Sequence, residues 1–246
     1  MKKIILIIGL LGIALQAQSY LYIWQGGVKT DSFVVTNNLK IDFRTTVIMN
    51  ISCPGTPTVT YEGKTYNTVQ IGTQCWLKEN LNVGTRINGT QEPSNNGTIE
   101  KYCYEDNEAY CDTFGGLYQW KESLQYILTP GATGICPTGW HIPTRPEFEI
   151  LAAAVNSDGN ALKALGQGTG IGAGTNTSGF SALLSGYRES GGSFNSLAQL
   201  TEFWVSEASH FNQIMEQTLV LRYNSPNCEL GIEYISYGLS VRCVKD

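Results

Sequence analysis

The chain has 246 residues, of which 16 are basic and 21 acidic, and its formal net charge at pH 7 is −5. This acidic balance, with no basic run after Lys3, excludes the phosphate neutralisation on which nucleic-acid binding depends. The length is enough for one large domain with a small extension. The 27 glycines predict a loop-rich fold, because glycine takes positive φ without a steric penalty.

The first residues have the pattern of a secretory signal peptide. Lys2 and Lys3 precede a run of apolar residues and glycine over 4–15, and small residues follow near Ala17. The run has about 12 residues, fewer than the roughly 20 that cross a bilayer as a helix. We therefore expect residues 1–18 to be cleaved on export. No later stretch approaches spanning length, and no cysteine lies at the cleavage point to carry a lipid anchor.

The mature protein is thus expected to be soluble and without a membrane span. Because Lys2 and Lys3 leave with the signal peptide, 14 basic residues remain against 21 acidic ones, a net charge of about −7. Its expected location is the periplasm, the cell surface or the medium.

Seven cysteines in an exported chain are expected to be oxidised rather than to bind metal. No Cys-x-x-Cys pair occurs, and His141 and His210 are the only imidazoles. A zinc cluster or a three-histidine iron site is therefore not expected, and no metal ligand is assigned. Because seven is odd, one thiol is left over.

Residues 19–52 are predicted to form a β-structured N-terminal extension. Two β-prone stretches separated by Gln25-Gly26-Gly27 predict a hairpin, and a third strand-like stretch follows. The three stretches are 20–24, 32–35 and 45–51. The prolines within 53–57 cannot continue a sheet ladder, so the main domain is expected to span 53–246.

The main domain is predicted to open with two strands within 59–72 that turn at Glu62-Gly63-Lys64, and 82–97 is predicted to be a polar loop. The clearest helix signal covers 144–155. Thr144 can cap this helix while Glu147 reaches back to it, a capping box that satisfies two backbone amides.

Shorter helices are predicted at 117–124 and 159–166. From Phe180 onward the pattern changes to short strands and turns. The strand-like stretches there include 203–206, 218–223 and 239–244. Together these elements predict an α+β fold, in which a few helices pack on irregular antiparallel strands.

Two patterns that suggest chemistry lack the context that it requires. The glycine-rich segment 166–174 is not followed by a helix that would face a phosphate, so we interpret it as a flexible surface loop. Neither histidine has an identifiable partner, and no Gly-x-Ser-x-Gly elbow occurs. We therefore assign no catalytic residue and do not expect an enzyme.

The segment Glu92-Pro93-Ser94-Asn95 resembles the Glu-Pro-Asn loop with which calcium-dependent lectins hold sugar hydroxyls. Ser94 stands where the asparagine belongs, and no Trp-Asn-Asp follows to complete the oxygen cage that calcium prefers. We therefore expect no cofactor, and the alternative is that the loop binds calcium. Glu92 and Asn95 are retained as candidate ligand-binding residues.

Six segments follow one another in the order typical of a known family. They are 66–81, 116–120, 136–144, 179–183, 203–204 and 238–246. Together they resemble the Fibrobacter succinogenes major paralogous domain family over roughly residues 53–246. The resemblance implies an exported protein of the Bacteroidetes or Fibrobacteres, and it implies location better than activity.

The Pro-x-Gly-x-x-Ile-Pro-Thr pattern over 137–144 and the terminal Val-Arg-Cys are also similar to the formylglycine-generating, sulfatase-modifying group. This similarity implies a C-type-lectin-like fold. The closely spaced copper-binding cysteines of that oxidase have no counterpart, because Cys228 and Cys243 are too far apart. The pairing that we expect on such a scaffold joins Cys53 to Cys75, Cys103 to Cys111 and Cys136 to Cys243, and leaves Cys228 free.

The leading hypothesis is an exported, non-catalytic module that binds a glycan or a protein at the cell exterior. The binding surface is expected in loops 82–97 and 166–179, because loops on a stapled scaffold need little ordering on binding. Trp204 and Tyr187 are candidate stacking groups, and the alternative is that both belong to the core. Two other functions stay open, a sulfatase-modifying enzyme and a purely structural envelope protein.

Overall fold

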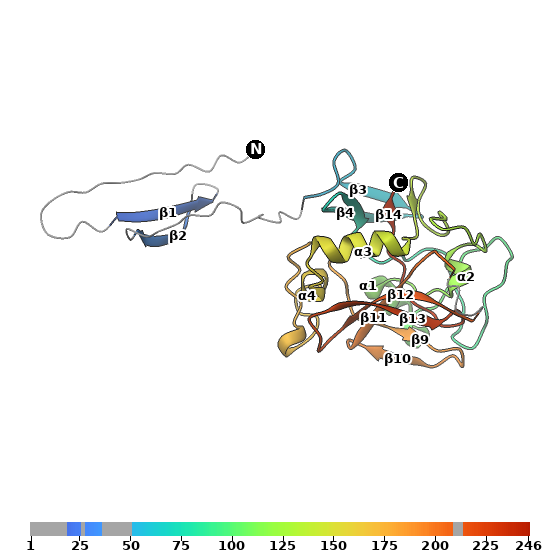
Figure 1. The fold of residues 1–246 in the computed structure, drawn as a ribbon. Coiled ribbons are helices and arrows are strands. Elements are labelled where there is room, and N and C mark those ends of the chain that lie inside the picture. The colour runs from blue at the N-terminus through green and yellow to red at the C-terminus, as the bar shows by residue number, and fades with distance from the viewer. Residues whose placement is uncertain (1–18, 26–27, 36–50, 209–213) are drawn as a thin grey trace, which may run out of the picture. The chain divides into compact units, whose positions relative to one another are not determined.

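The computed structural model describes residues 19–25, 28–35, 51–208 and 214–246. The chain divides into two compact units, Met1–Val47 and Ile48–Asp246, each considered by itself (Figure 1). The expected signal peptide, nearly all of the predicted strand 45–51 and His210 lie outside the described residues. Within the described ranges, no helix has the length and apolar character needed to cross a membrane.

The described part of the first unit is one antiparallel hairpin, as predicted. Strand β1 (Ser19–Gln25) pairs with β2 (Val28–Val35), with Tyr20 opposite Val34 and a shift of register after Ile23. Aromatic and β-branched residues are frequent in both strands and favour the extended backbone.

The largest sheet of the second unit has the order β3-β4-β5-β14-β8. Its strands are β3 (Thr58–Tyr61), β4 (Lys64–Ile71), β5 (Gln74–Leu77), β14 (Val244–Lys245) and β8 (Trp140–His141). The predicted turn between β3 and β4 lies at Glu62 (φ 48°) and Gly63 (φ 75°), the pair of positive φ angles that a type I′ hairpin requires. Because β14 pairs with both β5 and β8, the C-terminus lies inside this sheet.

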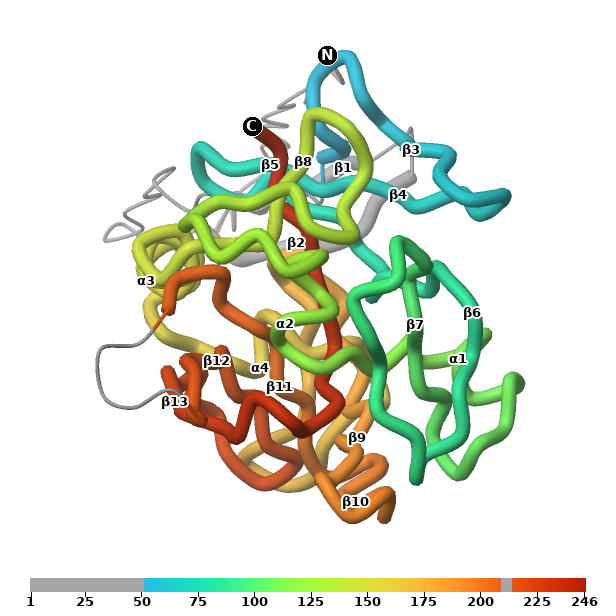
Figure 2. Tube along the Cα trace, turned by 90° about the vertical axis from the view of Figure 1, so that its right-hand side faces the viewer, coloured from blue at the N-terminus to red at the C-terminus, as the bar shows by residue number. Residues whose placement is uncertain are grey.

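A second sheet contains three antiparallel strands in the order β11-β12-β13. They are β11 (Leu200–Trp204), β12 (Met215–Arg222) and β13 (Cys228–Tyr234). Two small sheets accompany it, formed by β9 (Ser185–Arg188) with β10 (Phe194–Leu197) and by β6 (Thr85–Arg86) with β7 (Glu100–Lys101). Strand β9 packs against β11, and β10 lies on its outer side (Figure 2).

The helices of the described chain are short. They are α1 (Glu108–Phe114), α2 (Trp120–Ser123), α3 (Arg145–Ala154) and α4 (Gly159–Leu162), with 3-10 turns η1 (Tyr104–Asp106) and η2 (Gly170–Gly172). Helix α3 begins at the predicted capping box between Thr144 and Glu147. Helix α2 is shorter than predicted, because Leu117 forms a β-bridge with Tyr102 instead. Short helices on antiparallel strands confirm the α+β class.

A series of aromatic rings joins helix and sheets in the core. Trp76 of β5 stacks on Phe148 of α3, with ring centroids 5.5 Å apart, and meets Phe180 edge-on at 5.6 Å. Phe180 in turn meets Phe203 of β11 edge-on at 5.8 Å. Edge-on and stacked pairs of buried rings stabilise beyond the area that they bury. All four rings are fully buried.

Three disulfides staple the second unit, and they join the pairs expected from the resemblance. The bonds link Cys53 to Cys75, Cys103 to Cys111, and Cys136 to Cys243, while Cys228 is free and partly buried. The last bond joins cysteines 107 residues apart. A closed loop of that length stabilises by about 4 to 5 kcal/mol in the chain-entropy model.

A buried lysine anchors the glycine-rich loop. Lys163 is 0% exposed, and its ammonium donates to the carbonyl oxygens of Gly172 at 2.5 Å, Arg222 at 2.8 Å and Ser225 at 2.8 Å. The loop is exposed at Ile171, yet its backbone is tied to the end of β12. The interpretation of this segment as a flexible surface loop is therefore incomplete, because the sequence did not reveal this anchor.

Replacing Lys163 by methionine keeps an unbranched apolar stem but leaves three carbonyl groups without their donor. We expect Lys163→Met to lower the free energy of unfolding by about 3 kcal/mol, measured by urea denaturation. Lys121→Met, at an exposed position of α2, is the matched control and should change it by less than about 0.5 kcal/mol. Equal stability of the two variants would contradict the anchoring role.

Candidate functional site

Trp204, a candidate stacking residue, lies in the core. Its side chain is 0% exposed, and its indole N–H donates to the carbonyl oxygen of Tyr118 at 2.7 Å. With the ring covered, Trp204 offers no surface to a ligand, so the stacking hypothesis is wrong for this residue. The physical reason is that all five residues of β11 are buried, because both faces of this strand are covered.

A buried arginine holds the loop 82–97. Arg188 is 0% exposed and donates from Nε and Nη2 to the carbonyl oxygen of Gly89, at 2.8 and 2.6 Å. Nη2 also donates to Oε1 of Glu92 at 2.9 Å, while the other carboxylate oxygen of Glu92 accepts from Gln119. Glu92 therefore anchors the loop, and its carboxylate is already engaged.

The remaining two candidate residues, Asn95 and Tyr187, have side chains that are partly or fully accessible. Asn95 is exposed. Tyr187 of β9 is partly buried, and its ring stacks on that of Tyr237 with centroids 5.6 Å apart and planes inclined by 8°. Of the two proposed stacking residues, only Tyr187 in β9 therefore keeps part of its ring accessible.

Tyr187 belongs to a group of three tyrosines. The ring of Tyr237 also contacts that of Tyr234, with centroids 5.5 Å apart, and Tyr234 is 44% exposed at the end of β13. A β-bridge between Arg188 and Gly238 brings the segment after β13 beside β9. Two segments that are far apart in the sequence therefore contribute the rings of this stack.

Glutamates gather on the same face. Glu189 follows Tyr187 closely, while Glu202 in β11 and Glu233 in β13 lie on one face of the three-stranded sheet. Their β12 partners are Val220 and Glu216, four residues apart, so the side chains point to the same side. We define the Tyr–Glu face by Tyr187, Glu189, Glu202, Glu233 and Tyr237. Tyr234 stands at its edge, because it follows Glu233 in β13 and leaves the strand on the opposite side, and it reaches the face through its ring contact with Tyr237.

Two glutamates of this face, Glu202 and Glu233, have raised pKa values. Burial raises the pKa of Glu202 to about 7, and the negative charge of Glu233 raises it too, while a hydrogen bond from Thr218 Oγ1 at 2.9 Å and the charge of Arg222 lower it. Burial likewise raises the pKa of Glu233. Glu202 is thus the group of this face that changes charge near neutral pH.

The same carboxylates influence the pKa values of two tyrosines of the face, Tyr187 and Tyr237. Burial raises the pKa of Tyr187 and of Tyr237, and the charge of Glu189 raises both further. This coupling indicates that rings and carboxylates lie within electrostatic reach of one another. Chemically, the face offers aromatic surface together with hydrogen-bond acceptors.

Most of the Tyr–Glu face was not predicted from the sequence. Only Tyr187 was a candidate, although the segment 233–237 reads Glu-Tyr-Ile-Ser-Tyr and follows a strand. Polar aromatic residues and a carboxylate at a strand end are a signal for a surface site. Local sequence patterns do not reveal, however, that the segment after β13 lies beside β9.

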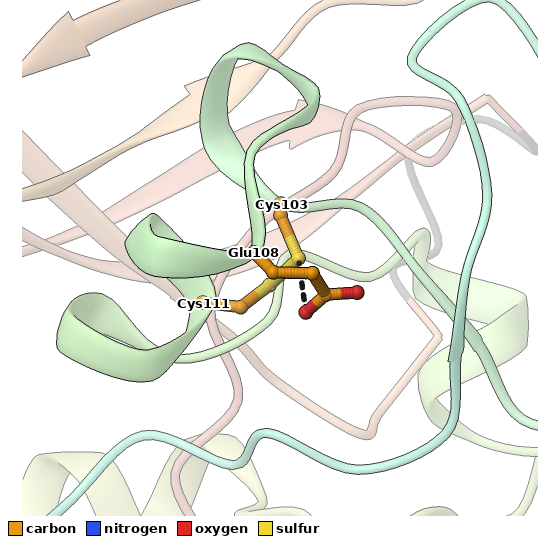
Figure 3. A group of neighbouring side chains, drawn as sticks. All are labelled: Cys103, Glu108 and Cys111. Atoms are coloured by element: carbon orange, nitrogen blue, oxygen red, sulfur yellow. Dashed lines mark hydrogen bonds between the residues drawn. A yellow bond between two sulfur atoms is a disulfide. The ribbon is translucent and has the colours of Figure 1, made fainter.

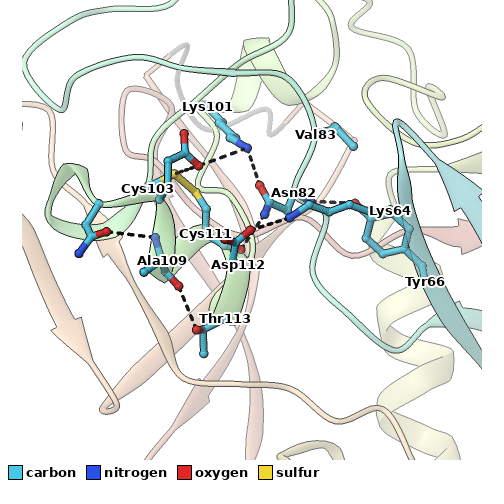
Figure 4. A network of polar contacts seen from close by, with 12 residues as sticks. Lys64, Tyr66, Asn82, Val83, Lys101, Cys103, Ala109, Cys111, Asp112 and Thr113 are labelled. Carbon is cyan, nitrogen blue, oxygen red and sulfur yellow. Dashed lines mark hydrogen bonds and ion pairs between the residues drawn. A yellow bond between two sulfur atoms is a disulfide. The ribbon is translucent and has the colours of Figure 1, made fainter.

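A cavity of about 400 Å³ with several charged residues in its lining forms a second candidate site. Its lining includes Lys64, Lys78, Glu79, Asp112, Ser181 and Arg242. Figure 4 shows the ion pair between Lys64 and Asp112, 3.0 Å long, at this cavity. Beside it Asn82 accepts from Lys101 Nζ at 2.6 Å and donates to the carbonyl oxygen of Cys111 at 2.8 Å.

One group of potential metal ligands occurs among the described residues, at Cys103, Glu108 and Cys111 (Figure 3). Glu108 Oε2 lies 3.4 Å from Cys103 Sγ. The two sulfurs are joined to each other in a disulfide, however, and a cysteine binds a metal as its thiolate. In this oxidised form the group offers no thiolate for a metal.

His141 links the C-terminus to α3. Its Nε2 lies 2.9 Å from Glu147 Oε1, and its Nδ1 lies 2.6 Å from Asp246 Oδ1. The hydrogen bond to Glu147 raises the pKa of His141, and Asp246 raises it as well, although burial lowers it. With a carboxylate on each ring nitrogen, His141 has two partners that the sequence did not identify, and its imidazole holds a proton more tightly than an exposed one.

The fold and these sites define a disulfide-stapled, strand-rich α+β domain. A model of the Fibrobacter succinogenes major domain matches residues 69–245, most of the chain. The chain belongs to this family, which confirms the resemblance seen in its motifs. No match was found among curated proteins or among solved structures.

The raised pKa of Glu202 predicts a pH-dependent stability. The folded protein holds this proton with a pKa of about 7, against 4.5 for an exposed glutamate, so the folded state binds the proton more tightly. Stability is therefore lost as the pH rises from about 4.5 to about 7, on the order of 3 kcal/mol from this group.

Glu202→Gln should flatten this dependence in chemical denaturation at about pH 5 and about pH 8. Glu62→Gln, in the exposed turn between β3 and β4, should retain it. An unchanged slope in the Glu202 variant would show that the carboxyl titrates in its ordinary range.

Proposed function

We propose that this protein is an exported, non-catalytic module that binds a glycan at the cell exterior through the Tyr–Glu face. The observation that carries the proposal is the stack of Tyr187 on Tyr237, extended by the exposed ring of Tyr234 and bordered by carboxylates. The residues come from β9, from β13 and from the turn that follows β13.

The chemistry of the face fits carbohydrate. A sugar presents an apolar C–H side, which packs on an aromatic ring, and hydroxyl groups, which donate to carboxylate oxygens. Glu189 and Glu233 are partly exposed acceptors beside the rings. The negative charge of the face favours a neutral glycan over an acidic one.

The scaffold supports a recognition role. Strands position side chains more rigidly than loops do, and a preformed surface loses little entropy on binding. The C-type-lectin-like architecture and the export of the chain are parts of this proposal. The three disulfides fit an oxidising compartment.

The sulfatase-modifying enzyme is the alternative from another class. Such an oxidase requires two reactive cysteines close together, whereas six of the seven cysteines are paired in disulfides. Burial raises the pKa of the remaining thiol, Cys228, which makes it less reactive. These observations favour binding over catalysis, while a purely structural role is tested by the same experiment as binding.

The proposal is tested by applying the mature chain to a glycan array with and without calcium. We expect binding to neutral glycans that does not depend on calcium. Uniform absence of binding would favour the structural role, and binding only with calcium would move the site to the loop that contains Asn95.

For a glycan identified in this way, Tyr234→Ala should weaken binding about fivefold to tenfold, because one stacking ring is lost. Tyr223→Ala is the matched control. Tyr223 is 37% exposed but follows the opposite end of β12 from Met215, the residue that pairs with Tyr234. Titration calorimetry should find the affinity of this control unchanged, and equal losses in both variants would refute the assignment.

A further inference from the structure

The wall of the cavity beside Lys64 and Asp112 contains a buried cation whose hydrogen bonds all go to neutral groups. Arg242 is 1% exposed. It donates to Asn80 Oδ1 from Nε at 3.2 Å and from Nη2 at 2.6 Å. Nη1 donates to the carbonyl oxygens of Leu77 at 3.1 Å and Phe180 at 2.5 Å. No carboxylate forms an ion pair with this guanidinium within the described residues.

One donor of Arg242 is left over. A guanidinium has five N–H groups, and the four hydrogen bonds above use four of them. The remaining N–H belongs to Nη2. The planes of the guanidinium are covered by the rings of Phe180 at 4.4 Å and Phe203 at 5.4 Å, so its position is rigid.

The charges around the cavity leave a positive excess. Lys64 is paired with Asp112, and the carboxylate of Glu79 accepts from the backbone and side-chain N–H groups of Asn67, both at 2.8 Å. Lys78 lines the cavity, and in the described chain its ammonium forms no ion pair or hydrogen bond. With three cations and two carboxylates, the lining is positive in a chain whose net charge is −5.

We propose that this cavity is a second binding site, separate from the Tyr–Glu face, which holds a small hydroxylated carboxylate of the uronic-acid type. The carboxylate lies between Arg242 and Lys78, which supply charge-assisted hydrogen bonds. Glu79 and Asp112 repel a second negative charge, so a monoanion fits better than a phosphate dianion. The hydroxyl of Ser181 and the carboxylates of the lining provide partners for sugar hydroxyls, and a volume of about 400 Å³ admits one sugar ring.

The test is calorimetric titration of the mature chain with glucuronate, glucose, acetate and inorganic phosphate. We expect glucuronate to bind at least tenfold more tightly than glucose, acetate or phosphate. Comparable affinities for glucuronate and glucose would overturn the proposal, as would preferential binding of phosphate or no binding of glucuronate.

Lys78→Gln supplies the residue-level test, because Lys78 is partly exposed and lies outside the core. It should weaken glucuronate binding at least fivefold, whereas Lys121→Gln should leave it unchanged. An unaltered affinity in Lys78→Gln would also overturn the proposal. Tyr234→Ala should keep glucuronate binding, and Lys78→Gln should keep glycan binding at the Tyr–Glu face, so either site can fail without the other.

Discussion

The arrangement of the second unit depends on the hydrogen bonds and ring contacts that hold the buried guanidinium of Arg242. Its guanidinium reaches the carbonyl oxygens of Leu77 and Phe180, while the rings of Phe180 and Phe203 cover its planes. A charge can leave water only where other dipoles replace the lost hydration. A shift of the C-terminal segment along the sheets would therefore leave this cation buried without its hydrogen bonds. The disulfide of the next residue, Cys243, fixes the segment as well.

Buried cations that are hydrogen-bonded to neutral oxygens occur at three places in the fold. Arg188, Lys163 and Arg242 are each 1% exposed or less, and each donates mainly to neutral oxygens of irregular segments and strand ends. Long loops carry carbonyl groups that no helix or sheet satisfies, and a buried cation satisfies several of them at once. In this domain of short helices, cations thus take over part of the role of secondary structure.

The two candidate sites differ in charge for a structural reason. The Tyr–Glu face lies on the three-stranded sheet, where the register brings glutamates of β11 and β13 to one side. The cavity lies beside Arg242, where carbonyl groups and aromatic rings hold a cation. A neutral sugar at the first site and a carboxylate at the second would allow one module to recognise two chemical features of an extracellular polymer.

Features with local causes could be predicted from the order of the residues. The capping box at Thr144 and the turn at Glu62-Gly63 each depend on a few neighbouring residues, and the order of the motifs indicated the family. The candidate site could not be predicted in this way. Trp204 and Tyr187 both lie in strands, but the packing of other segments covers the first and leaves part of the second accessible. Which rings are buried and which carboxylates meet depends on contacts between distant segments, and hydrophobic periodicity contains no information about those contacts.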